Sequence, residues 1–185
     1  STDRTVEVAK DFGAAVLIQK GRGKGNAIAQ ALMHVNSDIE YVVFIDADFT
    51  YPSEYLPKMI EILQTHPDVG MVCGNRFNEH SQLGDFHDLL FIGNRALAFT
   101  HNLLNGVNMC DPLTGFRVVC WEILKDWKPK SKSFDVEVEL NHHVERKGYR
   151  ILEMPIHYRP RLGQKKLKLR HGLTILKRII AEALS

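Results

Sequence analysis

The chain has 185 residues, of which 44% are hydrophobic and 25% are charged, and its formal net charge is +2. This composition is typical of one soluble globular domain, it excludes a disordered or fibrous chain, and so small a net charge does not indicate a nucleic-acid partner. The apolar runs are shorter than the roughly 18 residues of a membrane span. The three cysteines lack metal-ligand spacing, which predicts free thiols in a reducing compartment.

The first 35 residues predict a helix, a short strand and a second helix. Gly13 is the expected end of the first helix, and residues 14–18 are apolar enough to form a buried strand. Residues 21–26 alternate glycine with cations, including Lys24, and precede a helix expected over 27–35. This arrangement is typical of a phosphate cradle and equally of a flexible basic turn, because it matches neither the Walker nor the dinucleotide pattern.

A continuous apolar stretch over residues 41–45 is followed directly by two carboxylates, Asp46 and Asp48. Such a run predicts a strand buried on both faces, and ligands of open α/β sheets bind outside the carboxyl ends of their strands. Both aspartates can therefore reach a hard cation, Mg²⁺ or Mn²⁺, that is shared with a diphosphate. Taken alone, the pattern favours a simple turn before Pro52.

Further polar side chains follow the next expected elements. A helix ending near Thr65 leads to a strand over 69–73, and Arg76 lies in the segment just after this strand. Arg95 lies inside a long helix expected over 89–104. The polar segment between them, 78–88, is typical of a functional or mobile loop. Asp111 then begins a turn that leads into a strand containing Arg117.

The last third of the chain combines a capped helix, an edge strand and a basic tail. Ser133 is the expected N-cap of a helix over 134–147 that stops at Gly148, and Pro155 interrupts a strand over 149–158, which predicts a sheet edge. Six basic residues fall between 159 and 170 with no acid among them. The final helix, over 169–184, is amphipathic and basic, which indicates packing on the domain or contact with an anionic membrane surface.

Taken together and in order, these motifs resemble those of the family-2 glycosyltransferases of GT-A fold, and in particular the dolichyl-phosphate mannose and polyprenyl-phosphate hexose synthases. The motifs that carry the resemblance cover nearly the whole chain: Gly23-Lys24-Gly25, Asp46-Ala47-Asp48, Gly74-Asn75-Arg76-Phe77, Gly93-Asn94-Arg95, Asp111 with Thr114-Gly115-Phe116-Arg117, Phe134-Asp135-Val136-Glu137, Lys147-Gly148-Tyr149-Arg150 and Tyr158-Arg159-Pro160-Arg161. The resemblance implies a Rossmann-like α/β fold with a mixed, mainly parallel sheet flanked by helices. Its first β-α-β portion is expected to be missing here, with the GT-A domain over 1–168 and an amphipathic helix over 169–185.

The resemblance also implies an activity. It is the inverting, metal-dependent transfer of a hexose from a GDP- or UDP-sugar to dolichyl or polyprenyl phosphate, at the cytoplasmic face of a membrane. Mg²⁺ or Mn²⁺ is the expected cofactor, bound by Asp46 and Asp48. The implied catalytic residues are Asp48, Arg76 and Arg95, and the implied substrate-binding residues are Lys24, Asp46, Asp111, Arg117, Arg159, Arg161 and Lys166.

Two positions depart from the family pattern. Thr50 stands where the family often has a glutamine near the metal, and Lys165 stands where it has a serine. The first puts a metal contact at residue 50 in doubt, and the second weakens a role for Lys165 but not for Lys166.

Three other functions remain open from the sequence. A soluble family-2 enzyme with a hydroxyl acceptor requires a general base, for which Asp111 and Asp135 are the candidates. A nucleotidyltransferase shares the α/β layout, although the Thr114–Arg117 turn argues against it. A binding or scaffold module without activity is the third alternative. A lipid phosphate acceptor is different, because it is already mostly an anion at neutral pH and needs no strong base.

Overall fold

The computed structural model of the protein describes residues 3–77, 89–160 and 169–185. Its centre is a four-stranded sheet of order β1-β3-β2-β4. The strands are β1 Tyr41–Phe44, β2 Val69–Asn75, β3 Arg117–Cys120 and β4 Arg150–Pro155. β3 is antiparallel to both β1 and β2, whereas β2 and β4 are parallel. The expected mixed α/β sheet is confirmed, but most of its pairings are antiparallel because β3 runs against the other strands.

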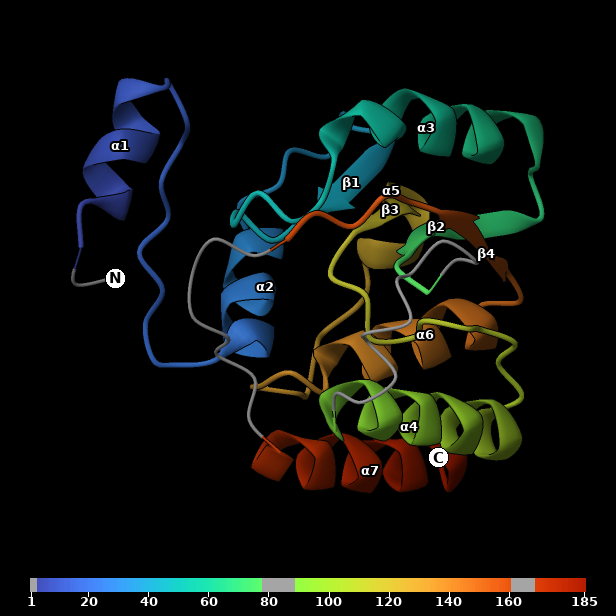
Figure 1. Ribbon diagram of the computed structural model, residues 1–185. Coiled ribbons are helices and arrows are strands. Elements are labelled where there is room, and N and C mark those ends of the chain that lie inside the picture. Colours follow the sequence, from blue (N-terminus) through green and yellow to red (C-terminus); the bar gives the residue numbers. More distant parts are fainter. Residues whose placement is uncertain (1–2, 78–88, 161–168) are drawn as a thin grey trace.

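Helices cover both faces of this sheet (Figure 1). They are α1 Thr5–Asp11, α2 Lys24–Leu32, α3 Leu56–Thr65 after a 3₁₀ turn Ser53–Tyr55, α4 Leu89–Asn105, α5 Trp121–Leu124, α6 Val136–Arg146 and α7 Leu169–Ala183. α3 lies on one face and α6 on the other, with α4 and α7 side by side beyond α6. α1 stands apart from the sheet and has no buried residue.

Alternation along the strands divides the core into two parts. Met71 and Cys73 of β2 face α6 and pack against Leu140. Val72, on the opposite face, packs with Met59 of α3. This alternation is the strand periodicity expected for a sheet that is buried on both faces. A separate cluster fixes the last helix, where Ile175 and Ile179 of α7 pack on Val138 of α6.

Local signals in the sequence located most helix ends correctly. Gly13, Gly106 and Gly148 follow α1, α4 and α6 with positive φ angles, which is the conformation that stops helices at glycine. Ser133 is not the cap that was predicted, because α6 begins after Asp135 and has no side-chain cap hydrogen bond.

The strand predicted over residues 14–18 is wrong. These residues are irregular, and Leu17 and Ile18 are exposed. Among the described residues, β1 forms its ladder with β3, and residues 14–18 join no strand of the sheet. Apolar composition alone therefore did not produce a strand, because a strand requires a hydrogen-bonding partner.

The cysteines and the edge strand match expectation. All three cysteines are free thiols, and β4, which ends at Pro155, lies at an edge of the sheet. Among the described helices, none combines the length and the apolar character that crossing a bilayer requires.

Candidate active site

The site begins at the carboxyl end of β1, where Asp48 is held by a short turn. The Thr50 hydroxyl donates to Asp48 Oδ1 over 2.6 Å and the Thr50 amide donates to the same atom over 3.2 Å. Phe49, between them, has φ +68°, a left-handed conformation that non-glycine residues rarely adopt. Thr50 is fully buried, so it fixes the orientation of the Asp48 carboxylate.

Asp46 is positioned by the turn that precedes β3. A Cβ atom added to Gly115 would lie 2.6 Å from Asp46 Oδ2, so only glycine allows the carboxylate to approach the backbone so closely. The Gly115 amide donates to the Tyr51 hydroxyl over 2.8 Å. The Asp46-Ala47-Asp48 segment and the Thr114–Arg117 turn therefore form one structural unit.

Lys24, the first residue of α2, joins Asp46 to α6. Its ammonium lies 2.9 Å from Asp46 Oδ1 and 2.7 Å from Glu137 Oε1. Burial disfavours the charged form of Lys24, but the two carboxylates outweigh this effect and raise its pKa. The ammonium therefore remains charged throughout the physiological range.

The glycine-rich segment before α2 serves for close packing. A Cβ at Gly23 or Gly25 would lie 2.0 or 2.2 Å from backbone oxygens of residues 132 and 131. The Gly25 amide donates to Ser133 O over 3.1 Å, so it is not available to a phosphate. Of the two interpretations of this segment, the turn is favoured, although it is a packed turn rather than a flexible one.

Arg76 follows β2 and forms a bidentate pair with Asp111. Nε and Nη2 of Arg76 each donate to an Asp111 oxygen over 2.7 Å, and the Arg76 amide donates over 3.1 Å. Burial of Arg76 is outweighed by the Asp111 carboxylate, which raises the Arg76 pKa well above its ordinary value. Glu153 of β4 holds the same turn, because its carboxylate accepts from the amides of Cys110 and Asp111 over 2.6 Å each.

The register of the strands brings the Asp46–Asp48 segment and the Arg76–Asp111 pair to the same edge of the sheet. Phe44 of β1 and Cys73 of β2 both pair with Arg117 of β3, so the ends of β1 and β2 lie level. Tyr51 and Tyr158 connect the groups further. Their rings contact edge to face with centroids 5.1 Å apart, and the Arg76 guanidinium lies 5.6 Å from the Tyr158 centroid.

Two other predicted arginines, Arg95 and Arg117, donate hydrogen bonds to main-chain carbonyl groups of the protein itself. Arg95 Nη1 donates to Cys110 O over 3.2 Å. Arg117 is fully buried, and it donates to the carbonyls of Thr114 (2.9 Å) and Pro112 (2.6 Å) and to the Asn141 amide oxygen. This arrangement holds the turn that carries Gly115, so direct contact between Arg117 and substrate stays a prediction.

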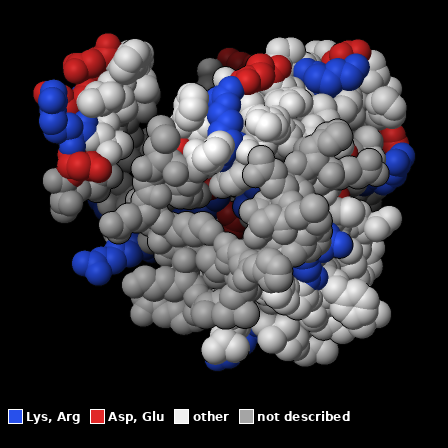
Figure 2. All heavy atoms as spheres, in the orientation of Figure 1, with Lys and Arg blue, Asp and Glu red and all other residues white. Residues whose placement is uncertain are grey.

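The basic tail is only partly within the described residues. The Arg159 guanidinium contacts Glu54 and lies 4.6 Å from the centroid of the Phe49 ring, beside the turn of Asp48. Arg161, Lys165 and Lys166 lie outside the described residues. In the space-filling view, acidic and basic atoms are visible deep in the centre of the face that is drawn (Figure 2).

The donor set fits a hard divalent cation. The described ranges contain no group of three or more His, Cys, Asp or Glu side chains that would enclose a metal ion. Mg²⁺ and Mn²⁺ do not need one when a substrate phosphate completes their coordination, since one or two carboxylates then suffice. Asp46 and Asp48 provide two carboxylates at the carboxyl end of β1.

Three residues of the site were not among the predicted ones. Tyr51 and Glu153 gave no signal in the sequence, because their roles depend on contacts with distant turns. Glu137 belongs to the Phe134-Asp135-Val136-Glu137 motif, but no role in the site was assigned to it from the sequence. Its position two residues after Asp135, at the same motif, was the available signal.

Residues 1–148 match the family described as Glycosyl transferase family 2. The chain therefore belongs to this family of glycosyltransferases, and the class predicted from the sequence is confirmed. It is 36% identical over 169 residues to the dolichyl-phosphate hexose transferase of Haloferax volcanii, which covers 90% of this chain and 70% of that protein. It is also 23% identical over 192 residues to the dolichol-phosphate mannosyltransferase of Pyrococcus furiosus, covering 96% of this chain and 53% of the relative.

Solved structures with the same fold include glucosyl-3-phosphoglycerate synthase from Mycobacterium tuberculosis. A complex of that enzyme with Mn²⁺, UDP-glucose and phosphoglyceric acid aligns with a TM-score of 0.73 at 22% identity, covering 100% of this chain and 64% of the other. Another of its structures holds Mg²⁺ and UDP. The chain thus spans about half to two thirds of the length of most of these proteins, for example 52% of glycosyltransferase AglJ from Haloferax volcanii, to which it is 33% identical.

Proposed function

We propose that this chain carries the catalytic site of a hexosyltransferase that moves a sugar, with inversion, from a nucleotide-diphosphate sugar to dolichyl or polyprenyl phosphate. The observation that carries the proposal is the grouping of Asp46, Asp48 and the Arg76–Asp111 pair at one edge of the sheet. The names of the relatives support a lipid phosphate acceptor, and the Mn²⁺ and UDP-glucose of the structural neighbour support a nucleotide-sugar donor.

The state of the two candidate bases supports a phosphate acceptor. Asp111 is 1% exposed and is bound bidentately by Arg76. Asp135 is 5% exposed, and its carboxylate accepts from Arg178 Nε over 3.0 Å. Both carboxylates are buried and already bound by a guanidinium, so neither is free to contact an acceptor hydroxyl as a general base. A phosphate monoester needs no such base, whereas a hydroxyl acceptor does.

The residues have distinct proposed roles in this reaction. Asp46 and Asp48 would hold Mg²⁺ or Mn²⁺, which neutralises the charge that develops on the departing diphosphate. Thr50 keeps the Asp48 carboxylate in position through its hydroxyl and amide. Arg95, Arg159, Arg161 and Lys166 are cations suited to the phosphates of donor and acceptor. Rate enhancement then comes from positioning and from electrostatic stabilisation.

Transfer of radiolabelled sugar tests this function. UDP-glucose and GDP-mannose are offered with dolichyl phosphate and Mn²⁺, and product is extracted into organic solvent. We expect lipid-linked sugar from one of the donors and a loss of at least about 100-fold in Asp48→Asn, because a charged metal ligand becomes neutral. Full activity of Asp48→Asn, or transfer to a sugar hydroxyl but never to lipid phosphate, would contradict the proposal.

We also propose that α4 and α7 rest on the membrane that supplies this lipid. On each helix, exposed apolar side chains recur with the same i, i+7, i+11 spacing and so form a stripe along the helix. The residues are Ile92, Phe99 and Leu103 on α4, and Leu173, Ile180 and Leu184 at α7. The helices lie side by side, and α4 presents a mostly uncharged surface in the space-filling view (Figures 1 and 2). Apolar stripes of this kind, on helices one of which follows a basic segment in the sequence, are typical of helices that enter the membrane interface.

Sedimentation with vesicles tests the membrane contact. Phe99 and Phe12 are 69% and 87% exposed, so a matched pair of variants is available in one residue type. Phe99→Glu is expected to weaken binding to vesicles of phosphatidylcholine and phosphatidylglycerol about tenfold, whereas Phe12→Glu, directly after the separate α1, has little effect. Equal effects of the two variants would show that the α4 stripe is not a membrane contact.

A further inference from the structure

Glu137 has a buried carboxylate oxygen that the protein does not satisfy. Glu137 is 7% exposed, and its Oε1 accepts from Lys24 over 2.7 Å. Its Oε2 atom is buried and has no hydrogen-bond partner among the described residues. Buried carboxylate oxygens normally accept hydrogen bonds, since an unmade one is energetically costly. This atom therefore indicates a donor that comes from outside the chain.

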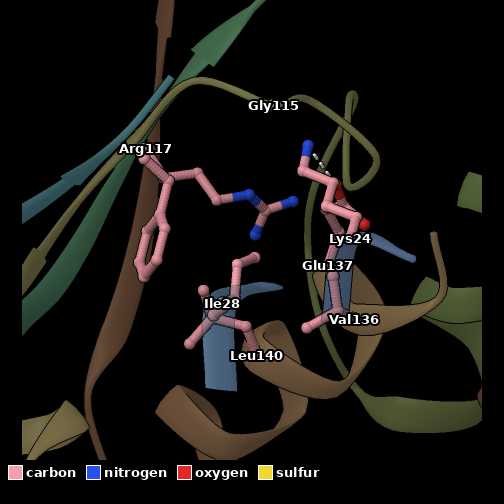
Figure 3. Close-up of a pocket in the computed structure, with 8 residues that line it drawn as sticks. Lys24, Ile28, Gly115, Arg117, Val136, Glu137 and Leu140 are labelled. Carbon is pink, nitrogen blue, oxygen red and sulfur yellow. Dashed lines mark ion pairs between the residues drawn. The ribbon is translucent and has the colours of Figure 1, made fainter. Parts of the chain in front are cut away.

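Glu137 lines a small cavity together with Lys24 (Figure 3). Lys24 and Glu137 lie together on one wall, and the Arg117 side chain reaches toward them from β3 on the other. Ile28 of α2 and Leu140 of α6 provide apolar floor. The space is of the order of one water-sized group, so it can receive a hydroxyl but not a whole sugar ring.

The cavity adjoins the proposed donor site. Gly115 lines it, and the same glycine touches the Asp46 carboxylate. Asp46 and Glu137 share the Lys24 ammonium, which bonds to both over less than 3 Å. An ammonium has three donors, and these two contacts use two of them. A hydroxyl entering the cavity would therefore find an acceptor on Glu137 and a donor on Lys24, and one hydroxyl can use both.

We propose that Glu137 Oε2 accepts a hydrogen bond from one hydroxyl group of the sugar in the nucleotide sugar, while Lys24 donates to the oxygen of that hydroxyl. This inference rests on the proposed function, because it assigns part of the donor's sugar to the cavity beside Asp46. It makes Glu137 a specificity-determining residue. A donor that lacks this hydroxyl leaves the buried oxygen without a partner, and sites built in this way reject such analogues strongly.

Calorimetric titration with Mn²⁺ present separates the sugar from the nucleotide. The probes are UDP and UDP-glucose, and GDP and GDP-mannose, on the unmodified chain and on Glu137→Gln. Glu137→Gln is expected to weaken the nucleotide sugar at least about tenfold and the matching diphosphate less than about threefold, because only the sugar contacts residue 137. Glu145→Gln, on the same helix, is the matched control and should change neither affinity.

A series of singly deoxygenated donors identifies the hydroxyl. One deoxy sugar should bind the unmodified chain about as weakly as the complete donor binds Glu137→Gln, and the two losses should not add. Glu137→Asp, which keeps the charge beside Lys24 but withdraws the oxygen, provides a second variant should Glu137→Gln fail to fold. Equal effects on diphosphate and nucleotide sugar, or additive losses for every deoxy donor, would overturn the role of Glu137 alone. Failure of the unmodified chain to bind any of the four probes would overturn the proposed function as well.

Discussion

Gly115 and Asp46 are in direct contact, and a side chain at position 115 would displace the Asp46 carboxylate. A Cβ atom there would lie 2.6 Å from Asp46 Oδ2 and 3.0 Å from its Cγ. The Gly115 amide is fixed at the same time by the Tyr51 hydroxyl. The turn before β3 thus determines where one of the two proposed metal ligands points.

Gly115→Ala is expected to impair metal binding more than folding. The clash involves the end of a flexible side chain, so the Asp46 carboxylate can rotate away from the new methyl group and the free energy of unfolding should fall by only about 1 kcal/mol. The displaced carboxylate should weaken Mn²⁺ binding in the presence of UDP or GDP about tenfold, as measured by calorimetry. Gly93→Ala, where an added Cβ meets nothing within 4 Å, is the control. Unchanged Mn²⁺ affinity in Gly115→Ala would show that Asp46 does not bind the ion.

Sequence patterns predicted the elements of this site but not its internal contacts. The strands before Asp46 and Arg76 were predicted correctly, because a buried strand is recognisable from a short run of apolar residues in the sequence. The pairing of Arg76 with Asp111 spans 35 residues, and the Gly115–Tyr51 bond spans 64. Such contacts depend on register and turn geometry, which a single sequence does not specify.

The strand expected over 14–18 is a case in which a local pattern predicted an element that the structure does not contain. Its residues are as apolar as those of real strands, yet Ile18 is 67% exposed and unpaired in a ladder. The glycines at 23 and 25 were assigned to a phosphate cradle or a flexible turn. In the structure, these positions require glycine because the backbone of residues 131–133 packs directly against them. Composition therefore indicates which conformation a segment prefers, and contacts with the rest of the fold decide whether the segment adopts it.

Breaking the Arg76–Asp111 pair should destabilise the fold strongly. Asp111 is 1% exposed, so Arg76→Gln leaves a buried carboxylate without its counter-charge. Loss of one partner of a buried pair typically costs about 3–5 kcal/mol, which urea unfolding can measure. Arg150→Gln is the matched control, because the Arg150–Asp68 pair is 62% and 54% exposed and should contribute less than about 1 kcal/mol. Similar losses in the two variants would contradict the central role of the buried pair.

Gly25→Ala should separate α2 from the segment that precedes α6. Its Cβ would lie 2.2 Å from the Ser131 carbonyl oxygen, a backbone atom that cannot rotate away. We expect a loss of about 1–3 kcal/mol in the free energy of unfolding, as is typical of overpacking. Gly172→Ala in α7 meets nothing within 4 Å and should instead stabilise the protein by about 0.5–1 kcal/mol, because alanine is the better helix former. A neutral Gly25→Ala would show that α2 is not held by this close approach.

His101 should make stability depend on pH between about 4 and 6.5. The imidazole is fully buried in α4, and amide nitrogens of Asn105 and Asn141 lie 3.0 and 3.3 Å from its two ring nitrogens. Burial, followed by the charges of Arg117 and His142, lowers the pKa of His101 to about 4. The unfolded chain binds this proton with a pKa near 6.5. Between these two pH values the unfolded state binds more protons than the folded state. The stability that neutral His101 contributes is therefore fully present above about pH 6.5. It is lost as the pH decreases toward 4, which lowers the free energy of unfolding by about 3 kcal/mol in total.

The contribution of His101 is isolated by comparing variants. His101→Gln is expected to unfold more readily at pH 7.5 because it disturbs a buried network, but its further loss between pH 7.5 and 4.5 should be smaller than that of the unmodified chain by about 2–3 kcal/mol. His34→Gln, at an exposed histidine that follows α2, is the control for the substitution itself. Urea unfolding at several pH values gives both quantities. Parallel pH profiles for the unmodified chain and His101→Gln would mean that the buried imidazole accepts a proton in the folded state as readily as in the unfolded one.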